Sequence, residues 1–568
     1  IEYGDYDILE DIFIAPSKGS ITRDIDPETV PYTYADVYYN DEFFLSNESS
    51  TGETFILRDF RGLNIKVFPY QYNPATKELR IYKTANIKVV KNNQIDAINE
   101  LVRARTEKSL DKEFSEIYKR QFLNFSNFQT RYTPLAEGTP GTIVVLAKSE
   151  FIDNIADYVS WKREKGHEVI LVKSDTVGGT NANNLKTWVQ NYFHEINFTY
   201  LLIVGDAQHI PPLKISNEDS DNAYAYVLGN DSYADFFVGR FSGESSADIL
   251  TQVQRTVHYE RDLNETDTWI ENAFGSASSE GAGWGHDGGE SDVQHLDKIK
   301  NALTDYGYTV THVNEAGGNN TQILNAFNSG QSLANYIGHG DVTLWVNTNF
   351  TNTNVNQLQN KNKLPFVISV ACVNGAFRGT TCFAEAWLRA QKDGLPTGAL
   401  VFLGSTINQS WEEPMTAQDE MNEVLIEMHQ NNIKRTVGGV AYAGYFKMIE
   451  AGGEGISTAN TWTVFGDPSA SLRTKTPEEM TIAHNNVMIL GTTEFQVACD
   501  TDGALAALST EENGETILLG YAYVADGNAQ IELFEPITTP VIVKLTLTAF
   551  NKITYQENIQ VIVPDGPF

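Results

Sequence analysis

The stretch LPFVISVAC, residues 364–372, is a run of apolar residues that ends in a cysteine. Solid apolar runs of this kind recur through the middle of the chain, at residues 142–147, 168–172, 200–206, 236–240, 333–340 and 398–406. The segments between them carry helical periodicity, and two of these segments, 151–166 and 290–307, end at a glycine. Strands buried on both faces and separated by helices are typical of a parallel sheet covered by helices on each side. We therefore expect an α/β domain with a mostly parallel sheet.

The two ends of the chain have a different pattern. Residues 1 to about 90 alternate apolar and polar side chains, which predicts an antiparallel β domain, and the polar, basic segment 91–131 favours an exposed connector. After residue 476, short alternating stretches predict roughly seven strands of an immunoglobulin-like β-sandwich. The predicted domains are 1–131, 132–476 and 477–568, and the middle one is expected to divide into two subdomains near residue 256.

Composition limits the possible partners. The 568 residues include 41 Lys and Arg against 74 Asp and Glu, a net charge of −33, which argues against binding to nucleic acid or to anionic membranes. No run of about 18 apolar residues is present, so we expect no transmembrane segment. No signal peptide is visible, which suggests a form that has lost its targeting segment. Three cysteines are too few for a disulfide scaffold.

Two potentially reactive side chains lie at predicted strand ends. His339 ends the run at 333–340 between two glycines, and Cys372 ends the run at 364–372. Both positions are expected at the same edge of the sheet, where an imidazole can take the proton of a thiol and the thiolate can attack a carbonyl. Glycines beside the histidine would leave backbone N–H groups available for an oxyanion hole. A cysteine at a strand end is more often a small buried hydrophobe, so the pattern alone leaves both interpretations open.

The other cysteines have no predicted chemistry. Cys382 lies at the start of a predicted helix, and Cys499 lies on a predicted sandwich strand. If Cys372 is the nucleophile, a disulfide between Cys372 and Cys382 would consume it, so we expect both to be free thiols in an active enzyme.

Two acidic loops are also candidates. The glycine-rich loop 278–295 is either a flexible helix entrance or a recognition loop whose carboxylate selects a cationic side chain. The loop 229–235 combines aspartates with backbone carbonyls in a pattern that suits a hard cation such as Ca²⁺, although the pattern alone is weak.

Several longer segments resemble one known family. The segments NYIGHGDVTLW, LPFVISVACVNGAF, CFAEAWLRAQKDGLPTGA, STINQSW and NTWTVFGDPS, together with LGNDSY and GESDVQH, resemble the arginine-specific gingipains. These are cysteine endopeptidases with a caspase-like fold. The resemblance runs from about Tyr132 to the C-terminus, and it implies a secreted or bacterial cell-surface enzyme that cleaves peptide bonds after arginine.

The resemblance also implies roles for individual residues. Cys372 matches the nucleophile, His339 the general acid and base, and Glu280 the acidic residue that orients the histidine. The backbone N–H groups of Gly340 and Cys372 match the oxyanion hole. The implied substrate-binding residues are Asp292, at the base of the pocket, with Trp411, Met415 and Gly338.

Calcium is the only cofactor that the resemblance implies, with no redox or organic cofactor. The matching ligand positions are Asp206, Asp231, Tyr233, Asp235, Glu290 and His295.

Residues 1–131 are expected to form an inhibitory prodomain. Cleavage after Arg131 would activate the enzyme, with Arg103 and Arg105 as further processing sites. We hypothesise that Arg58 or Arg61, in the stretch LRDFRG, plugs the substrate pocket in the proenzyme. The expected partners are protein and peptide substrates with arginine before the cleaved bond, and the chain's own prodomain.

Two other functions stay open. One is a sortase-like transpeptidase on the same fold, which would transfer the acyl group to an amine. The other is an inactive adhesion protein that uses the sandwich. Product analysis with an added amine nucleophile distinguishes the transpeptidase from a peptidase, and an assay with an arginine amide substrate distinguishes the adhesion protein.

Overall fold

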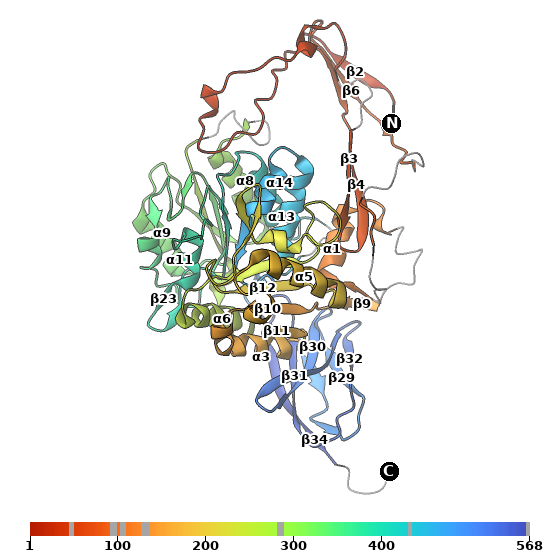
Figure 1. Ribbon diagram of the computed structural model, residues 1–568, viewed down its shortest axis with the longest axis vertical. Helices are drawn as coiled ribbons and strands as arrows, with labels where there is room; N and C mark the ends of the chain where they lie inside the picture. Colours follow the sequence, from red (N-terminus) through yellow and green to blue (C-terminus); the bar gives the residue numbers. More distant parts are fainter. Residues whose placement is uncertain are drawn as a thin grey trace.

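The computed structural model describes residues 1–44, 50–90, 99–102, 109–126, 136–280, 289–429 and 434–563. Within these ranges the chain forms an antiparallel β domain at the N-terminus, a central α/β domain and a C-terminal β-sandwich (Figure 1). The fold class predicted from the sequence is therefore confirmed. The proposed processing residues Arg103, Arg105 and Arg131 lie outside the described residues.

A ten-stranded sheet forms the centre of the α/β domain, in the order β11-β10-β12-β15-β26-β25-β22-β18-β16-β17. All neighbouring strands are parallel except β25 and β26. The strands are β10 (Ile143–Ala147), β11 (Val169–Lys173), β12 (Tyr200–Val204), β15 (Phe237–Phe241), β16 (Asn272–Ala277), β17 (Thr309–His312), β18 (Leu333–Ile337), β22 (Phe366–Val370), β25 (Val401–Ser405) and β26 (Trp462–Phe465). Strands β10, β12, β18, β22 and β25 are buried at every residue, which explains the solid apolar runs in the sequence.

Helices pack around this sheet, and two sets of them are in mutual contact. One set consists of α8, α12, α13 and α14, and the other consists of α3, α6 and α11. The helices around the sheet are α3 (Ala156–Glu164), α4 (Ser174–Val177), α5 (Ala182–Ile196), α6 (Ser246–Arg261), α8 (Asp292–Tyr306), α9 (Asn320–Ser329), α10 (Asn352–Val355), α11 (Phe383–Arg389), α12 (Glu413–Leu425), α13 (Val437–Ala451) and α14 (Gly455–Thr461). Residue 256, where a subdomain boundary is expected, lies inside α6. None of the helices in the described ranges combines the length and hydrophobicity needed to cross a bilayer.

Short ribbons complete the α/β domain. They are the pair β13 (Leu213–Ile215) and β14 (Glu218–Ser220), the triplet β19 (Gly340–Asp341), β20 (Leu344–Trp345) and β21 (Phe350–Thr351), and the pair β23 (Gln391–Lys392) and β24 (Leu395–Pro396).

Helix α8 shows how local sequence sets the element that carries a candidate pocket residue. Ser291 caps its N-terminus and forms a capping box with Gln294. Gly307 ends the helix with a left-handed φ of 114°, a conformation that glycine adopts without steric cost. Asp292 is therefore fixed as the first helical residue.

The C-terminal domain is a sandwich of a three-stranded sheet, β27-β29-β32, and a five-stranded sheet, β28-β34-β33-β30-β31. The strands are β27 (Ile482–His484), β28 (Val487–Ile489), β29 (Glu494–Cys499), β30 (Leu505–Glu512), β31 (Glu515–Tyr523), β32 (Asn528–Glu532), β33 (Ile542–Thr548) and β34 (Tyr555–Ile562). Cys499 is buried in its core, as expected for a small hydrophobe.

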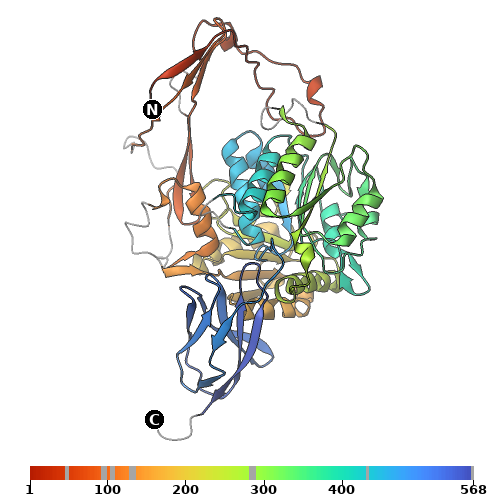
Figure 2. The same cartoon turned by 180° about the vertical axis from the view of Figure 1, so that it is seen from behind.

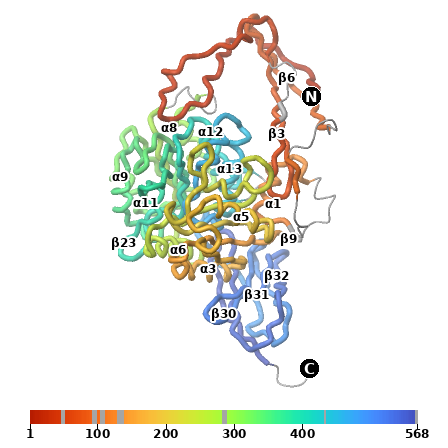
Figure 3. The backbone as a smooth tube through the Cα atoms, in the orientation of Figure 1, coloured from red at the N-terminus to blue at the C-terminus, as the bar shows by residue number. Residues whose placement is uncertain are grey.

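The N-terminal domain is built from antiparallel pairs, β1 with β7, β3 with β4, and the sheet β2-β6-β5. The strands are β1 (Glu2–Tyr3), β2 (Tyr6–Leu9), β3 (Ser50–Leu57), β4 (Phe60–Lys66), β5 (Tyr70–Asn73), β6 (Glu78–Tyr82) and β7 (Ala85–Asn86). Figure 3 shows that this domain arches away from the α/β domain and that its early residues return to the neighbourhood of α8.

The connector is only partly an exposed segment. It contains β8 (Ser109–Asp111), which pairs in parallel with β9 (Ala136–Thr139), and helix α1 (Lys112–Gln121). Helix α1 buries Phe114, Ile117 and Tyr118 in the core of the molecule. The prediction of an exposed connector is wrong for this part, because these three side chains lie on one helical face.

Candidate active site

Two neighbouring parallel strands place His339 and Cys372 at the same edge of the central sheet. Ile337 at the end of β18 is paired with Val370 at the end of β22, and the imidazole and the thiol each follow two residues later. Gly340 packs directly against the cysteine, where an added Cβ would lie 2.3 Å from the Cys372 carbonyl oxygen. A side chain at position 340 would therefore clash with the Cys372 backbone. Without one, the Gly340 N–H lies close to the thiol.

The His339 ring is held in place by a carboxylate. Its Nε2 lies 2.7 Å from Oε2 of Glu280, and its backbone N–H donates to Oδ1 of Asn347 at 2.6 Å. The Trp411 ring lies edge-on to the imidazole, with the ring centroids 5.8 Å apart. A carboxylate bonded to one ring nitrogen fixes the orientation of the imidazole and leaves the other nitrogen to exchange a proton.

The Cys372 thiol is buried in this structure. Burial is the largest effect on its pKa, and it raises the pKa above that of an ordinary thiol. Hydrogen bonds from the backbone N–H groups of Gln409 and Gly340 and the positive charge of Arg23 lower the pKa, whereas the nearby Asp24 carboxylate raises it. The surroundings of Cys372 thus contain hydrogen-bond donors that would stabilise a thiolate, but its burial in this structure favours the neutral thiol.

A buried carboxylate lies next to this pair. Asp292 is 1% exposed, and its Oδ2 accepts a hydrogen bond from the Ser278 hydroxyl at 2.6 Å. Its backbone N–H donates to the Glu280 carbonyl at 3.0 Å, which links the pocket to the segment that holds the histidine. The expected pocket walls are also buried: Trp411 lies just before α12, and Met415 lies in its first turn. The N-terminus of α8 favours the negative charge of Asp292.

Gly338, the last expected substrate-binding residue, is tightly enclosed. A Cβ at this position would lie 2.6 Å from Oδ1 of Asn347 and 3.2 Å from the Cβ of Ser278. Its N–H donates to the Val370 carbonyl at 3.1 Å. Its position therefore requires glycine for packing reasons.

The side chain that occupies the pocket is Arg23 of the N-terminal domain. Its Nη1 lies 3.1 Å from Oδ2 of Asp292, and its guanidinium stacks 4.3 Å above the Trp411 ring. The backbone around it pairs with the pocket rim, because the Arg23 N–H donates to the Gln409 carbonyl at 2.8 Å and the Trp411 N–H donates to the Ile21 carbonyl at 2.9 Å. This antiparallel pairing and the buried guanidinium are how a peptide with an arginine side chain would bind.

The hypothesis that Arg58 or Arg61 fills this pocket is wrong. The Arg58 guanidinium donates to backbone carbonyls of the α/β domain away from Asp292, and the exposed Arg61 donates to the Thr54 hydroxyl. The sequence did contain one signal for Arg23, since it is the only arginine before position 58. Ser278, Asn347 and Gln409, which position the site, carried no signal that sequence reasoning could use.

All three cysteines are free thiols, as expected for Cys372 and Cys382. Cys382 is buried at the N-terminus of α11, where burial raises its pKa well above that of an ordinary thiol. It has no part in the arrangement around His339.

The expected calcium ligands do not converge in this structure. Both oxygens of each carboxylate among Asp206, Asp231, Asp235 and Glu290 have nitrogen neighbours. The Tyr233 hydroxyl accepts from Asn64, and His295 bonds to Glu290. Asp206 and Glu290 are already paired with basic side chains, and among the described residues these six supply no cluster of three or more carboxylate or imidazole ligands, so as arranged here they do not form one shared calcium site.

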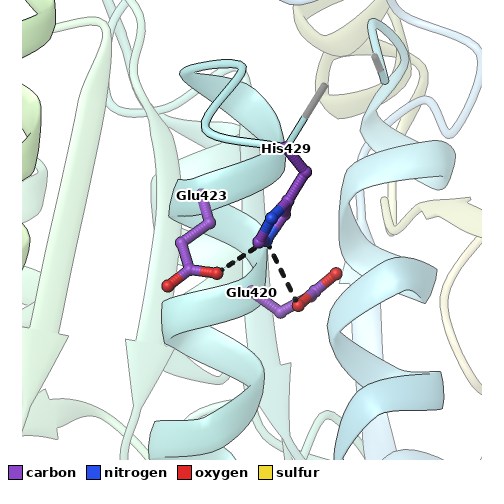
Figure 4. A group of neighbouring side chains, drawn as sticks. All are labelled: Glu420, Glu423 and His429. Atoms are coloured by element: carbon purple, nitrogen blue, oxygen red, sulfur yellow. Dashed lines mark hydrogen bonds and ion pairs between the residues drawn. The ribbon is translucent and has the colours of Figure 1, made fainter. Parts of the chain in front are cut away.

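A different cluster has the composition of a metal site. Among the described residues, side-chain atoms of Glu420, Glu423 and His429 lie close enough together to hold an ion (Figure 4). His429 Nε2 is 2.8 Å from Glu423 Oε2 and 3.9 Å from Glu420 Oε2. Arg120 of α1 already binds Glu420 through Nε and Nη2, at 3.3 and 3.2 Å. We therefore interpret the cluster as an ionic contact between α1 and α12.

Comparison with known proteins agrees with this geometry. The family model described as "Peptidase family C25" matches residues 136–473, the model Propeptide_C25 matches 4–131, and the C-terminal Ig-like domain of the same family matches 483–562. Gingipain R2 of Porphyromonas gingivalis is 43% identical over 558 residues, which is 97% of this chain and 74% of that protein.

Two solved structures share the fold. The Arg-specific cysteine proteinase gingipain R is 42% identical, with a TM-score of 0.73, and covers 76% of this chain and 100% of its own. The complex of the Porphyromonas gingivalis RgpB pro- and mature domains is also 42% identical, with a TM-score of 0.72, and covers 74% of this chain and 100% of its own. These similarities do not favour the transpeptidase or adhesion alternatives.

The burial of Cys372 generates a testable prediction. Because burial raises its pKa, alkylation of Cys372 by iodoacetamide in the uncleaved chain should reach half of its maximal rate at a pH above about 8.5, the value of an exposed thiol. Removing the nearby negative charge with Asp24→Asn should move this midpoint down. Mass spectrometry of each cysteine-containing peptide gives the rates.

Cys382, whose pKa is also raised, serves as the internal control and should stay unmodified over the same pH range. A Cys372 midpoint at or below that of the urea-unfolded chain would contradict the interpretation.

Proposed function

The chain belongs to peptidase family C25 as a cysteine peptidase proenzyme with its propeptide, and from this premise we propose that its mature form cleaves peptide bonds after arginine. The observation that carries the proposal is the binding of Arg23 in the Asp292 pocket. The molecule holds one of its own arginines where a substrate arginine would have to lie.

Recognition follows from the contacts that Arg23 makes. A substrate guanidinium would pair with the Asp292 carboxylate and stack on Trp411, and its backbone N–H would donate to the Gln409 carbonyl. A buried carboxylate without a cation is unfavourable, so the pocket selects a positive side chain. The flat aromatic wall favours the planar guanidinium over the ammonium group of lysine.

The reaction then proceeds as acyl transfer. His339, oriented by Glu280, takes the proton of Cys372, and the thiolate attacks the carbonyl carbon of the substrate arginine. The negative oxygen of the tetrahedral intermediate accepts hydrogen bonds from the backbone N–H groups of Gly340 and Cys372, which are proposed to form the oxyanion hole. His339 gives its proton to the leaving amine, and a water molecule releases the acyl group and restores the thiol.

The N-terminal domain keeps this machinery inactive. Arg23 fills the pocket, its backbone pairs with the rim, and the covered thiol has a raised pKa. We propose that cleavage after Arg131, with Arg103 and Arg105 as further sites, begins activation. An arginine at each of these positions makes self-processing possible.

We also propose a location outside the cytoplasm, either secreted or at the bacterial cell surface, as the resemblance implies. Immunodetection in culture supernatant and on intact cells, compared with a cytoplasmic marker, tests this proposal. In the proenzyme Asp206 and Glu290 are paired with basic side chains, and no step of the proposed reaction uses calcium.

The processed enzyme should hydrolyse a fluorogenic amide of arginine at least about tenfold faster than the matching lysine amide, because only the guanidinium combines ion pairing with stacking. Cys372→Ala should lower the rate by at least about 10³-fold. Initial rates at equal enzyme concentration give both values. A Cys372→Ala variant that keeps full activity, or a processed enzyme without arginine amidase activity, would refute the proposed function.

Loss of the pocket occupant should open the uncleaved chain. Arg23→Ala removes a buried charge-assisted contact, so the uncleaved variant should hydrolyse the arginine amide at least about tenfold faster than the uncleaved wild type. Gel electrophoresis of the assayed sample confirms that the chain is intact. Lys18→Ala, a change of another cation in the same segment, is the matched control and should leave the rate unchanged. Equal rates for Arg23→Ala and the wild type would show that Arg23 does not block the site.

A further inference from the structure

Arg58 is an arginine in an unusual backbone position. It lies with Asp59 in the two-residue turn between β3 and β4, whose last paired residues are Leu57 and Phe60. Its φ is 47°, in the left-handed region, although it has a Cβ. Such a conformation costs free energy and persists only where surrounding contacts over-determine it.

Those contacts come from the α/β domain. The Arg58 guanidinium donates through Nη1 to the carbonyls of Phe198, at 2.9 Å, and Asp235, at 2.6 Å, and through Nη2 to the carbonyl of Asn197, at 2.8 Å. Its backbone N–H donates to Oδ1 of Asp235 at 3.0 Å. These groups form the arginine socket, which consists of residues 197, 198 and 235. Arg58 is 3% exposed in it.

The socket has the chemistry of a cation site. Asn197 is the C-cap of α5, so the carbonyls of Asn197 and Phe198 lie at the negative end of that helix. The guanidinium also stacks between the rings of Phe114 and Phe193, at 4.8 and 5.4 Å. Arginine fits such a site because its planar group donates in several directions and stacks at the same time.

Neighbouring contacts fix the same hairpin to the same surface. The Ile56 N–H donates to Oδ2 of Asp231 at 2.8 Å, and the Asn64 amide donates to the Tyr233 hydroxyl at 2.9 Å. The ring of Phe55 stacks on that of Tyr233, with centroids 4.0 Å apart. The turn is therefore the centre of a packed contact.

The two docked arginines bind in different places. Arg23 lies between β2 and β3 in the sequence and reaches Asp292 at the start of α8, whereas β3 and β4 run beside α1, on another side of the α/β domain (Figures 1 and 2). Arg23 pairs with one carboxylate beside the catalytic groups. Arg58 binds three carbonyls that have no contact with those groups.

We propose that the socket is a retention site for the N-terminal domain: Arg58 holds this domain on the enzyme after the connector is cut, and Arg23 alone blocks the pocket. The proposal rests on the proposed function only in treating residues 1–131 as a prodomain. It predicts a cleaved complex in which blocking and retention can be removed separately.

The test uses the full chain with Cys372→Ala, which prevents self-processing, and with the recognition sequence of a site-specific protease in place of residues 131–135. Size-exclusion chromatography after cutting measures retention of the N-terminal fragment. Fluorescence of p-aminobenzamidine, a cationic amidine, measures access to the Asp292 pocket before and after cutting. Arg58→Ala is compared with Arg23→Ala and with Arg61→Ala, the matched control from the same hairpin.

Before cutting, the Arg58→Ala variant should exclude the probe from the pocket to the same extent as the unchanged chain. This result would also show that its N-terminal domain is folded. After cutting, Arg58→Ala should lose the fragment, with a rise of about 100-fold in its dissociation constant, and should then bind the probe. Arg23→Ala should bind the probe before cutting and keep the fragment afterwards. Arg61→Ala should behave like the unchanged chain.

Retention of the fragment by cut Arg58→Ala, or probe binding by this variant before cutting, would overturn the proposal. Loss of the fragment by cut Arg23→Ala would overturn it as well. None of these readouts depends on peptide hydrolysis, so they separate this proposal from the proposed function. If the probe bound no form of the protein, the pocket assignment would fail, and the chromatography would still decide the retention.

Discussion

The ion pair between Arg23 and Asp292 is the interaction on which the rest of the proenzyme depends. Both side chains are almost completely buried, at 0 and 1% exposure. A buried carboxylate is costly without a cation, so the Asp292 pocket is stable when an arginine occupies it. The same requirement accounts for latency, when the cation is Arg23, and for the proposed specificity, when the cation belongs to a substrate.

The chemistry depends on a second constraint, the register of the sheet. Because β18 and β22 are parallel neighbours, their ends bring His339 and Cys372 together without any long-range loop. The absence of a side chain at Gly340 lets the backbone approach the cysteine. Val373, the residue after the nucleophile, has a left-handed φ of 46°, which is costly for a β-branched residue and marks the turn as functionally constrained.

The sequence was sufficient for the parts that depend on local pattern. Solid apolar runs predicted the buried parallel strands, and the strand ends with the family resemblance predicted His339, Cys372 and Asp292 as neighbours. The residue that fills the pocket could not be predicted in the same way, because the pairing of Arg23 with Gln409 and Asp292 joins residues more than 200 positions apart. The stretch LRDFRG contains Arg58 and Arg61, yet Arg58 lies at a turn whose contacts place it in a different site, and Arg61 is exposed. The buried face of α1 shows the same limit, since a polar segment can still carry one apolar stripe.

We infer that the charge of Asp292 selects arginine. The most direct measurement is kcat/KM of the processed enzyme for an arginine amide and for the citrulline amide, which has the same shape without the charge. We predict a preference for arginine of about 100-fold or more in the wild type, and a preference of about tenfold or less in Asp292→Asn. An arginine preference that survives this substitution unchanged would contradict it.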